Sequence, residues 1–66
     1  MGQNMHVVYR NKEWYFDEAM KVIQLLKRVR ILPETVLVVR NGQLVTEDHP
    51  LNVNDEVKIV AVISGG

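Results

Sequence analysis

Two short segments near the start of the chain have the hydrophobic pattern of paired β-strands. Residues 5–10 (MHVVYR) alternate so that three of their larger apolar side chains share one face of an extended segment. Residues 13–16 (EWYF) are dominated by aromatic side chains, which suit a pleated, half-buried surface. Asn11-Lys12 lies between them as a tight turn, so an N-terminal β-hairpin is expected.

The next segment has helical periodicity. Its apolar stripe consists of Ala19, Val22, Ile23, Leu25, Leu26 and Val29. Asp17 precedes the stripe, and its carboxylate is suited to accept hydrogen bonds from the free N–H groups of the first turn. The helix is expected to end near Arg30, because Pro33 disfavours helical geometry at the residue before it.

The second half of the chain predicts three more strands. Residues 36–40 (VLVVR) are dense in β-branched side chains, and Asn41-Gly42 supplies the positive φ angles of a type I′ turn. Residues 43–46 then return as a short strand. A loop over residues 47–54, anchored by Leu51 or Val53, leads into the last strand at residues 56–63.

The order β-β-α-β-β-β predicts an α+β fold of the β-grasp, or ubiquitin-like, type. The first and last strands can pair in parallel at the centre of the sheet, because a long connection that contains the helix separates them. We therefore expect a mixed sheet of four to five strands packed against one main helix. Residues 1–63 form the domain, and residues 64–66 (Ser-Gly-Gly) form a flexible tail.

The composition and net charge of the chain argue against several classes of function. The chain has 66 residues, no cysteine and a net charge of zero, which argues against a primary role on nucleic acid. No apolar run approaches the ~18 residues of a membrane span, and no signal peptide is evident, so a cytoplasmic protein without membrane contact is expected. His6 and His49 lack ligand spacing, so no metal site is expected.

The usual catalytic patterns are missing. Ser64 is the single serine and sits beside the terminus, and the sequence contains neither a phosphate-binding loop nor a dinucleotide fingerprint. The acidic pairs at residues 47–48 and 55–56 are interpreted as solvated turn charges. His6 is interpreted as an outward-facing strand residue. The chain is therefore expected to be a carrier that binds no cofactor, rather than an enzyme.

The terminal glycines are the strongest candidate site. Glycine has no Cβ, so a chain that ends in Gly65-Gly66 can enter a narrow channel and present its carboxylate to a nucleotide held by a partner. ATP can convert that carboxylate into an acyl-adenylate, which is a good acyl donor. Gly66 is thus the expected reactive residue, with Gly65 and Ser64 forming the tail. The alternative is an end without a function, since chain termini are often glycine-rich.

A surface for such a partner is expected on the last strand. If Val57 and Ile59 point into the core, then Lys58, Val60 and Val62 face away from the helix. Val39 or Leu37 on the neighbouring strand can join them. Exposed apolar patches often mark interaction sites, although an ordinary strand whose outer residues are partly covered by the rest of the fold would look the same in sequence.

The sequence resembles the ThiS/MoaD family of small sulfur carriers, which are relatives of ubiquitin. The resemblance covers essentially the whole chain and rests on residues 36–42 (VLVVRNG), residues 54–60 (NDEVKIV) and residues 63–66 (ISGG). It implies that a ubiquitin-activating-type enzyme uses ATP to adenylate Gly66, with Gly65 as the required neighbour. Sulfur from a persulfide donor enzyme is then installed as a thiocarboxylate and passed to a synthase or thiolase.

The short length and the Ser-Gly-Gly ending resemble those of the thiamine-thiazole and tRNA-thiolation carriers, whereas the small subunits of molybdopterin synthase are usually longer. The resemblance therefore favours the thiamine-thiazole pathway, with molybdopterin synthesis and tRNA thiolation as the other pathways. Two further functions stay open on the sequence. A ubiquitin-like modifier would be joined to lysines through Gly66, and a plain interaction domain would keep its function without Gly65 and Gly66.

Overall fold

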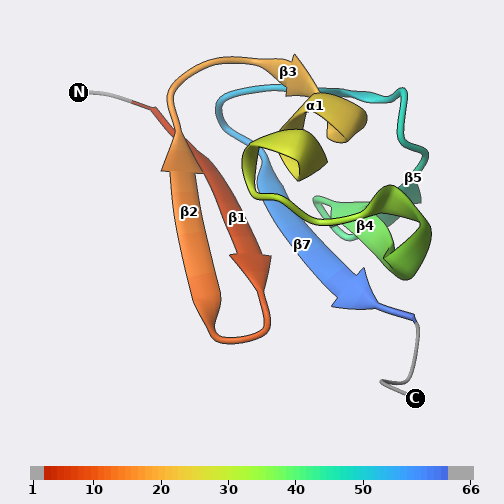
Figure 1. Ribbon diagram of the computed structural model, residues 1–66. Helices are drawn as coiled ribbons and strands as arrows, with labels where there is room; N and C mark the ends of the chain where they lie inside the picture. The colour runs from red at the N-terminus through yellow and green to blue at the C-terminus, as the bar shows by residue number, and fades with distance from the viewer. Residues whose placement is uncertain (1–2, 63–66) are drawn as a thin grey trace.

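The computed structural model describes residues 3–62 and shows a mixed sheet with one helix across one of its faces (Figure 1). The five-stranded sheet has the order β2-β1-β7-β4-β5. Its strands are β1 (Met5–Tyr9), β2 (Lys12–Phe16), β4 (Val36–Arg40), β5 (Gln43–Val45) and β7 (Glu56–Ala61). The other elements are β3 (Met20–Lys21), α1 (Val22–Arg28), the 3-10 turn η1 (Pro33–Thr35) and β6 (Pro50–Leu51).

The centre of the sheet is the parallel pair of β1 and β7. Val7 is opposite Val57 in this pair, and β7 also pairs antiparallel with β4, where Val38 is opposite Ile59. The two remaining strands are the outer arms of antiparallel hairpins, β1–β2 and β4–β5. The predicted β-grasp fold is therefore confirmed, including the parallel pairing of its first and last strands.

The two hairpin turns differ in how well the sequence located them. Asn41 and Gly42 have φ angles of 49° and 86°, and Arg40 pairs with Gln43, so the predicted two-residue turn is confirmed. The first hairpin turns at Arg10 and Asn11, one residue earlier than predicted, because Lys12 already pairs with Tyr9.

The predicted start of the helix is wrong. Residues 20–21 form β3, which pairs with β6, and α1 begins only at Val22. The first free N–H groups of α1 donate to backbone carbonyls of the later loop, from Val22 to His49 at 3.0 Å and from Ile23 to Glu47 at 2.8 Å. These long-range partners take the role that the sequence assigned to Asp17. Ala19 accordingly precedes the helix and is exposed.

The end of α1 lies close to its expected position. Its last residue is Arg28, and Arg30, just beyond it, adopts a left-handed φ of 62°. The N–H of Ile31 donates to the carbonyl of Leu26 at 2.9 Å and so satisfies one of the last helical carbonyls.

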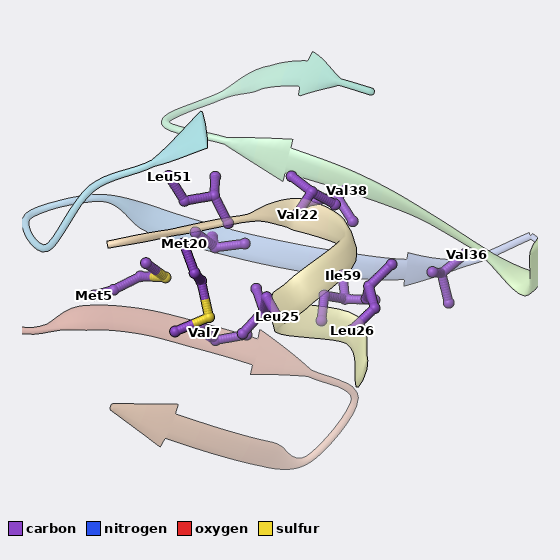
Figure 2. Packing of buried hydrophobic residues seen from close by; sticks show 11 residues of the cluster. Met5, Val7, Met20, Val22, Leu25, Leu26, Val36, Val38, Leu51 and Ile59 are labelled. Carbon is purple, nitrogen blue, oxygen red and sulfur yellow. The ribbon is translucent and has the colours of Figure 1, made fainter. Parts of the chain in front are cut away.

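The core lies between α1 and the inner face of the sheet (Figure 2). Leu25 and Leu26 of α1 pack against alternate residues of the central strands, among them Val57, which is fully buried. Leu51 is fully buried as well, which confirms it as the residue that anchors the segment at residues 47–54 to the core. The buried cluster consists of Met5, Val7, Met20, Val22, Leu25, Leu26, Val36, Val38, Leu51, Val57 and Ile59.

The last strand brings the chain to the edge of the described residues. β7 ends at Ala61, and the next residue, Val62, donates its N–H to the carbonyl of Thr35 at 3.0 Å. Ile63, predicted as the end of this strand, lies outside the described residues, and so do Ser64, Gly65 and Gly66. No helix within residues 3–62 is long and apolar enough to cross a membrane.

Candidate partner-binding surface

The outer face of the sheet, opposite α1, carries an apolar patch over its last strands. The register places Val39 opposite Lys58 and Leu37 opposite Val60, so these four side chains share the face that points away from the core. Val62 continues the same alternation beyond the end of β7. The grouping of Val39, Lys58, Val60 and Val62 that the sequence predicted is therefore brought together on one face.

The patch extends further than the sequence analysis expected. Leu44 of β5 is opposite Val39 and is 62% exposed, the largest exposed fraction in the patch. Leu37, Val60 and Val62 are exposed by 45%, 42% and 49%. The Asn-Gly turn fixes the pairing of β4 with β5, so counting outward from that turn would have identified Leu44. We call Leu37, Val39, Leu44, Val60 and Val62 the apolar patch.

A hollow borders the apolar patch at the outer edge of the sheet. Leu37 and Leu44 line it together with Val36 and Val45, and the helix contributes Leu26 to its wall. β5 is short, and its pairing with β4 begins only at Val38. The start of β4 is therefore not covered by β5, and an apolar side chain of a partner can enter between the strand and the helix.

The other end of the outer face is polar and centred on His6. The Nε2 atom of His6 lies 2.8 Å from Oε1 of Glu13, and its Nδ1 atom lies 2.7 Å from Oε2 of Glu56. The ring stacks on Tyr15 with the centroids 4.8 Å apart. The hydrogen bond that the His6 ring donates to Glu13 is the main cause that raises the pKa of His6, and the charge of Glu56 adds to it. The same hydrogen bond lowers the pKa of Glu13.

His6 faces outward, as predicted, but its environment is more organised than its sequence neighbours indicated. Its two carboxylate partners come from the neighbouring strands β2 and β7, so no local spacing reveals them. His49 instead makes a hydrogen bond with the backbone carbonyl of Pro50 at 2.8 Å. Across residues 3–62, no group of three or more His, Cys, Asp or Glu side chains is placed to hold a metal ion.

The interpretation of Asp55 as a solvated turn charge is wrong. Asp55 is only 5% exposed, and its carboxylate accepts hydrogen bonds from Nε of Arg40 at 2.6 Å, from Nδ2 of Asn41 at 3.1 Å and from the N–H of Asn52 at 2.8 Å. Burial raises the pKa of Asp55, but these hydrogen bonds outweigh it and hold that pKa below its usual range. Asp55 is therefore a structural link, by which we mean a buried carboxylate that holds together the segments from which its three donors come.

This link joins two of the sequence motifs. The side chain of Asn41 also accepts the N–H of Glu56 at 2.9 Å, and the N–H of Asn41 donates to the carbonyl of Glu56 at 2.8 Å. Residues 40–42 and 54–56 are thereby tied together at the start of β7. The strand that leads toward the terminal glycines is thus fixed at one end by the motifs and along its length by two neighbouring strands.

Comparison with known proteins agrees with the β-grasp fold. The model of the ThiS family matches residues 1–66, which is the whole sequence. The chain belongs to the ThiS family. Its predicted membership of the ThiS/MoaD group of small sulfur carriers is therefore confirmed.

A solved ThiS structure has the same fold. The crystal structure of the thiamine biosynthesis protein ThiS from Geobacter metallireducens superposes with a TM-score of 0.67 at 23% sequence identity. The match covers 94% of this chain and all of that chain. At this level of identity the likeness establishes the fold that the two proteins share, and the family match carries the membership.

Proposed function

We propose that this chain is a sulfur carrier of thiamine biosynthesis and that the carboxylate of Gly66 carries the sulfur. The family match over residues 1–66 supports the carrier role. The pathway is supported by the structural likeness to a thiamine biosynthesis protein and by the Ser-Gly-Gly ending. The chain contains no cysteine, so a sulfur atom that it carries has to be attached to another group. The terminal carboxylate is the group that ATP can activate.

The proposed chemistry takes place on partner enzymes. An oxygen of the Gly66 carboxylate attacks the α-phosphorus of ATP in a ubiquitin-activating-type enzyme, and pyrophosphate leaves. The terminal sulfur of a persulfide donor enzyme then attacks the carbonyl carbon and displaces AMP, which gives an acyl disulfide. A thiol cleaves its S–S bond, and the thiocarboxylate remains on Gly66. A sulfur-accepting synthase takes up the sulfur, and a thiolase would do so in tRNA thiolation.

The position of the apolar patch carries this proposal. Val60 belongs to β7, the strand that pairs on both sides and runs toward the terminal glycines. Val62, also in the patch, is the last described residue before the Ile-Ser-Gly-Gly ending. A partner that docks on the patch therefore meets the chain at the place where that ending begins. Docking and delivery of the terminus become a single event.

Glycine at the last two positions supports the same chemistry. A side chain on residue 66 would crowd the carboxylate as it attacks ATP, and later the sulfur nucleophile as it attacks the carbonyl carbon. Gly65 allows the backbone to take φ angles that other residues avoid. Ser64 precedes this pair as the remaining residue of the proposed tail.

Exchange of pyrophosphate into ATP tests the activation step. The full chain is incubated with the adenylating enzyme of the same organism, ATP and labelled pyrophosphate. The wild-type chain should support exchange, and a variant that lacks Gly65 and Gly66 should fold normally and support none. Exchange that does not depend on Gly65 and Gly66 would contradict the proposal. Recovery of the chain joined through Gly66 to lysines of other proteins would favour the modifier function instead.

A further inference from the structure

Three cationic side chains lie at the end of the sheet where β7 finishes. β1 and β7 run parallel, so the turn after β1, with Arg10, and the start of β2, at Lys12, lie at the same end of the sheet as Ala61 (Figure 1). Arg30 follows α1 on the inner side of the sheet. We call Arg10, Lys12 and Arg30 the basic end.

A hollow lies between two of these cations. Lys12 and Arg30 line it, and Tyr9 and Trp14 contribute aromatic surface. Thr35 also lines it, and the carbonyl of Thr35 is the group that holds the N–H of Val62. Ile31 and Leu32 complete its apolar wall, and no acidic residue lines it. The hollow therefore adjoins the point at which the chain continues toward Gly66.

The cations of the basic end have no ion-pair partner within residues 3–62. The salt bridges in that part of the chain involve Arg28, Arg40 and His6. Arg10 lies over the ring of Tyr9, 5.3 Å from its centroid, and this cation–π contact supplies no negative counter-charge. Glu34 is exposed in the neighbouring turn η1 but does not line the hollow. These cations therefore lie without a carboxylate partner from residues 3–62, close to the point at which the chain continues from Val62 toward Gly66.

Two of these cations lie where the backbone turns. Arg10 and Arg30 have φ angles of 57° and 62°, in the left-handed region. Arg10 lies in the turn between β1 and β2, and Arg30 lies just beyond the end of α1. Both residues are exposed, so a partner can reach their side chains.

We propose that the basic end binds an acidic segment of the enzyme that receives the C-terminus, a proposal that rests on the proposed function. The partner must reach this end of the sheet to take up Gly66. A carboxylate-bearing segment complements the cations, and an apolar side chain within it fits the aromatic hollow between Lys12 and Arg30. The cations of the basic end belong neither to the apolar patch nor to the group formed by His6, Glu13 and Glu56, so they make an additional contact on the same partner.

Charges as exposed as these act mainly on the rate of association. They attract an oppositely charged partner before contact, and salt weakens this attraction. Once the complex has formed, the apolar patch excludes water and controls dissociation. The basic end should therefore raise the association rate constant and leave the dissociation rate constant nearly unchanged.

The test measures binding of the full chain to the adenylating enzyme by stopped-flow at several salt concentrations, first without nucleotide and then with ATP. The double variant Lys12→Gln/Arg30→Asn removes two positive charges, and asparagine tolerates the left-handed φ of residue 30. Lys21→Glu, at an exposed position in β3, changes the net charge by the same amount and is the matched control. Thermal unfolding of each variant establishes that it folds.

We expect the double variant to associate about tenfold more slowly at low salt and to lose most of its salt dependence, with Lys21→Glu close to wild type. Equal rates for the double variant and wild type, or an equal loss in Lys21→Glu, would overturn the proposal. An effect that appears only with ATP bound would also overturn it, because nucleotide phosphates would then be the ligand. Pyrophosphate exchange by the wild-type chain separates these outcomes from failure of the proposed function.

Discussion

The guanidinium of Arg40 donates to the buried carboxylate of Asp55 across 2.6 Å, and this pair joins the turn after β4 to the start of β7. Arg40 belongs to the strand that precedes the Asn-Gly turn, and Asp55 belongs to the turn into the last strand. The contact explains why two motifs that are distant in the sequence occur together. Both hold the first residues of β7, whose far end leads to Gly66.

Replacing Asp55 by alanine should destabilise the protein strongly. The change leaves Arg40, Asn41 and the N–H of Asn52 without their shared acceptor, so we expect a loss of about 2–3 kcal/mol in the free energy of unfolding. Urea denaturation at neutral pH measures this. Asp48→Ala is the matched control, because Asp48 is exposed and its carboxylate accepts the hydroxyl of Thr46, which is exposed as well, so its loss should stay within about 0.5 kcal/mol. Equal losses in the two variants would show that Asp55 is not a structural link.

The ion pairs of His6 with Glu13 and Glu56 should make the free energy of unfolding depend on pH. The pKa of His6 is raised above 6.5 in the folded protein, chiefly by the hydrogen bond with Glu13. Protonation of His6 therefore stabilises the fold fully below pH 6.5, and this contribution is lost as the pH rises through the raised pKa. The difference in melting temperature between wild type and His6→Gln should be largest below pH 6.5 and should shrink as the pH rises above it.

Titration of the His6 ring by NMR checks the cause of this effect. Glu13→Gln removes the largest contribution to the shift, so the pKa of His6 should move back toward its ordinary value in that variant. A pKa of His6 that is the same in wild type and Glu13→Gln would contradict this explanation. Glu56→Gln should have a smaller effect in the same direction.

Gly42 should resist replacement because of its backbone conformation rather than its packing. Its φ is 86°, and nothing lies within 4 Å of the position that a Cβ would occupy. Gly42→Val should lower the free energy of unfolding by about 2 kcal/mol, because a β-branched residue avoids positive φ. Gly42→Asn fills the same open space with a residue that tolerates this conformation, so it should lose clearly less. Thermal unfolding that ranks the two variants equally would argue against the turn as described.

The apolar patch should control productive binding to the activating enzyme. Val60→Asp places a charge on an exposed position of β7, so the protein should fold while the KM for the carrier in pyrophosphate exchange rises by about tenfold or more. Gln24→Asp adds the same charge on the exposed side of α1 and should leave KM near the wild-type value. A KM for Val60→Asp that matches the control would place the binding surface elsewhere.

The sequence predicted those features whose causes are local. The Asn41-Gly42 turn follows from two residues that accept positive φ, and the inward position of Val57 follows from the twofold alternation of a strand. The outer residues Val39 and Val60 follow from the same alternation. Each of these needs only a few neighbouring residues, and each is confirmed.

The features that the sequence missed depend on contacts between distant segments. The helix begins at Val22 because carbonyls of the loop at residues 47–49 accept its first N–H groups, and no pattern near Asp17 reveals this. Asp55 is buried because Arg40, from a different strand, provides a charged donor. Leu44 is the exception, since the turn that was predicted already fixed its register and its face.

Mass spectrometry of the intact full chain tests the central claim most directly. The chain is incubated with the adenylating enzyme, ATP, a persulfide donor and a thiol, and its mass is compared before and after. Our account predicts the mass gain of one oxygen replaced by one sulfur, located at Gly66 by fragmentation and absent when ATP is omitted. An unchanged mass under conditions in which the partner enzymes are active, or a sulfur located at any other residue, would contradict it.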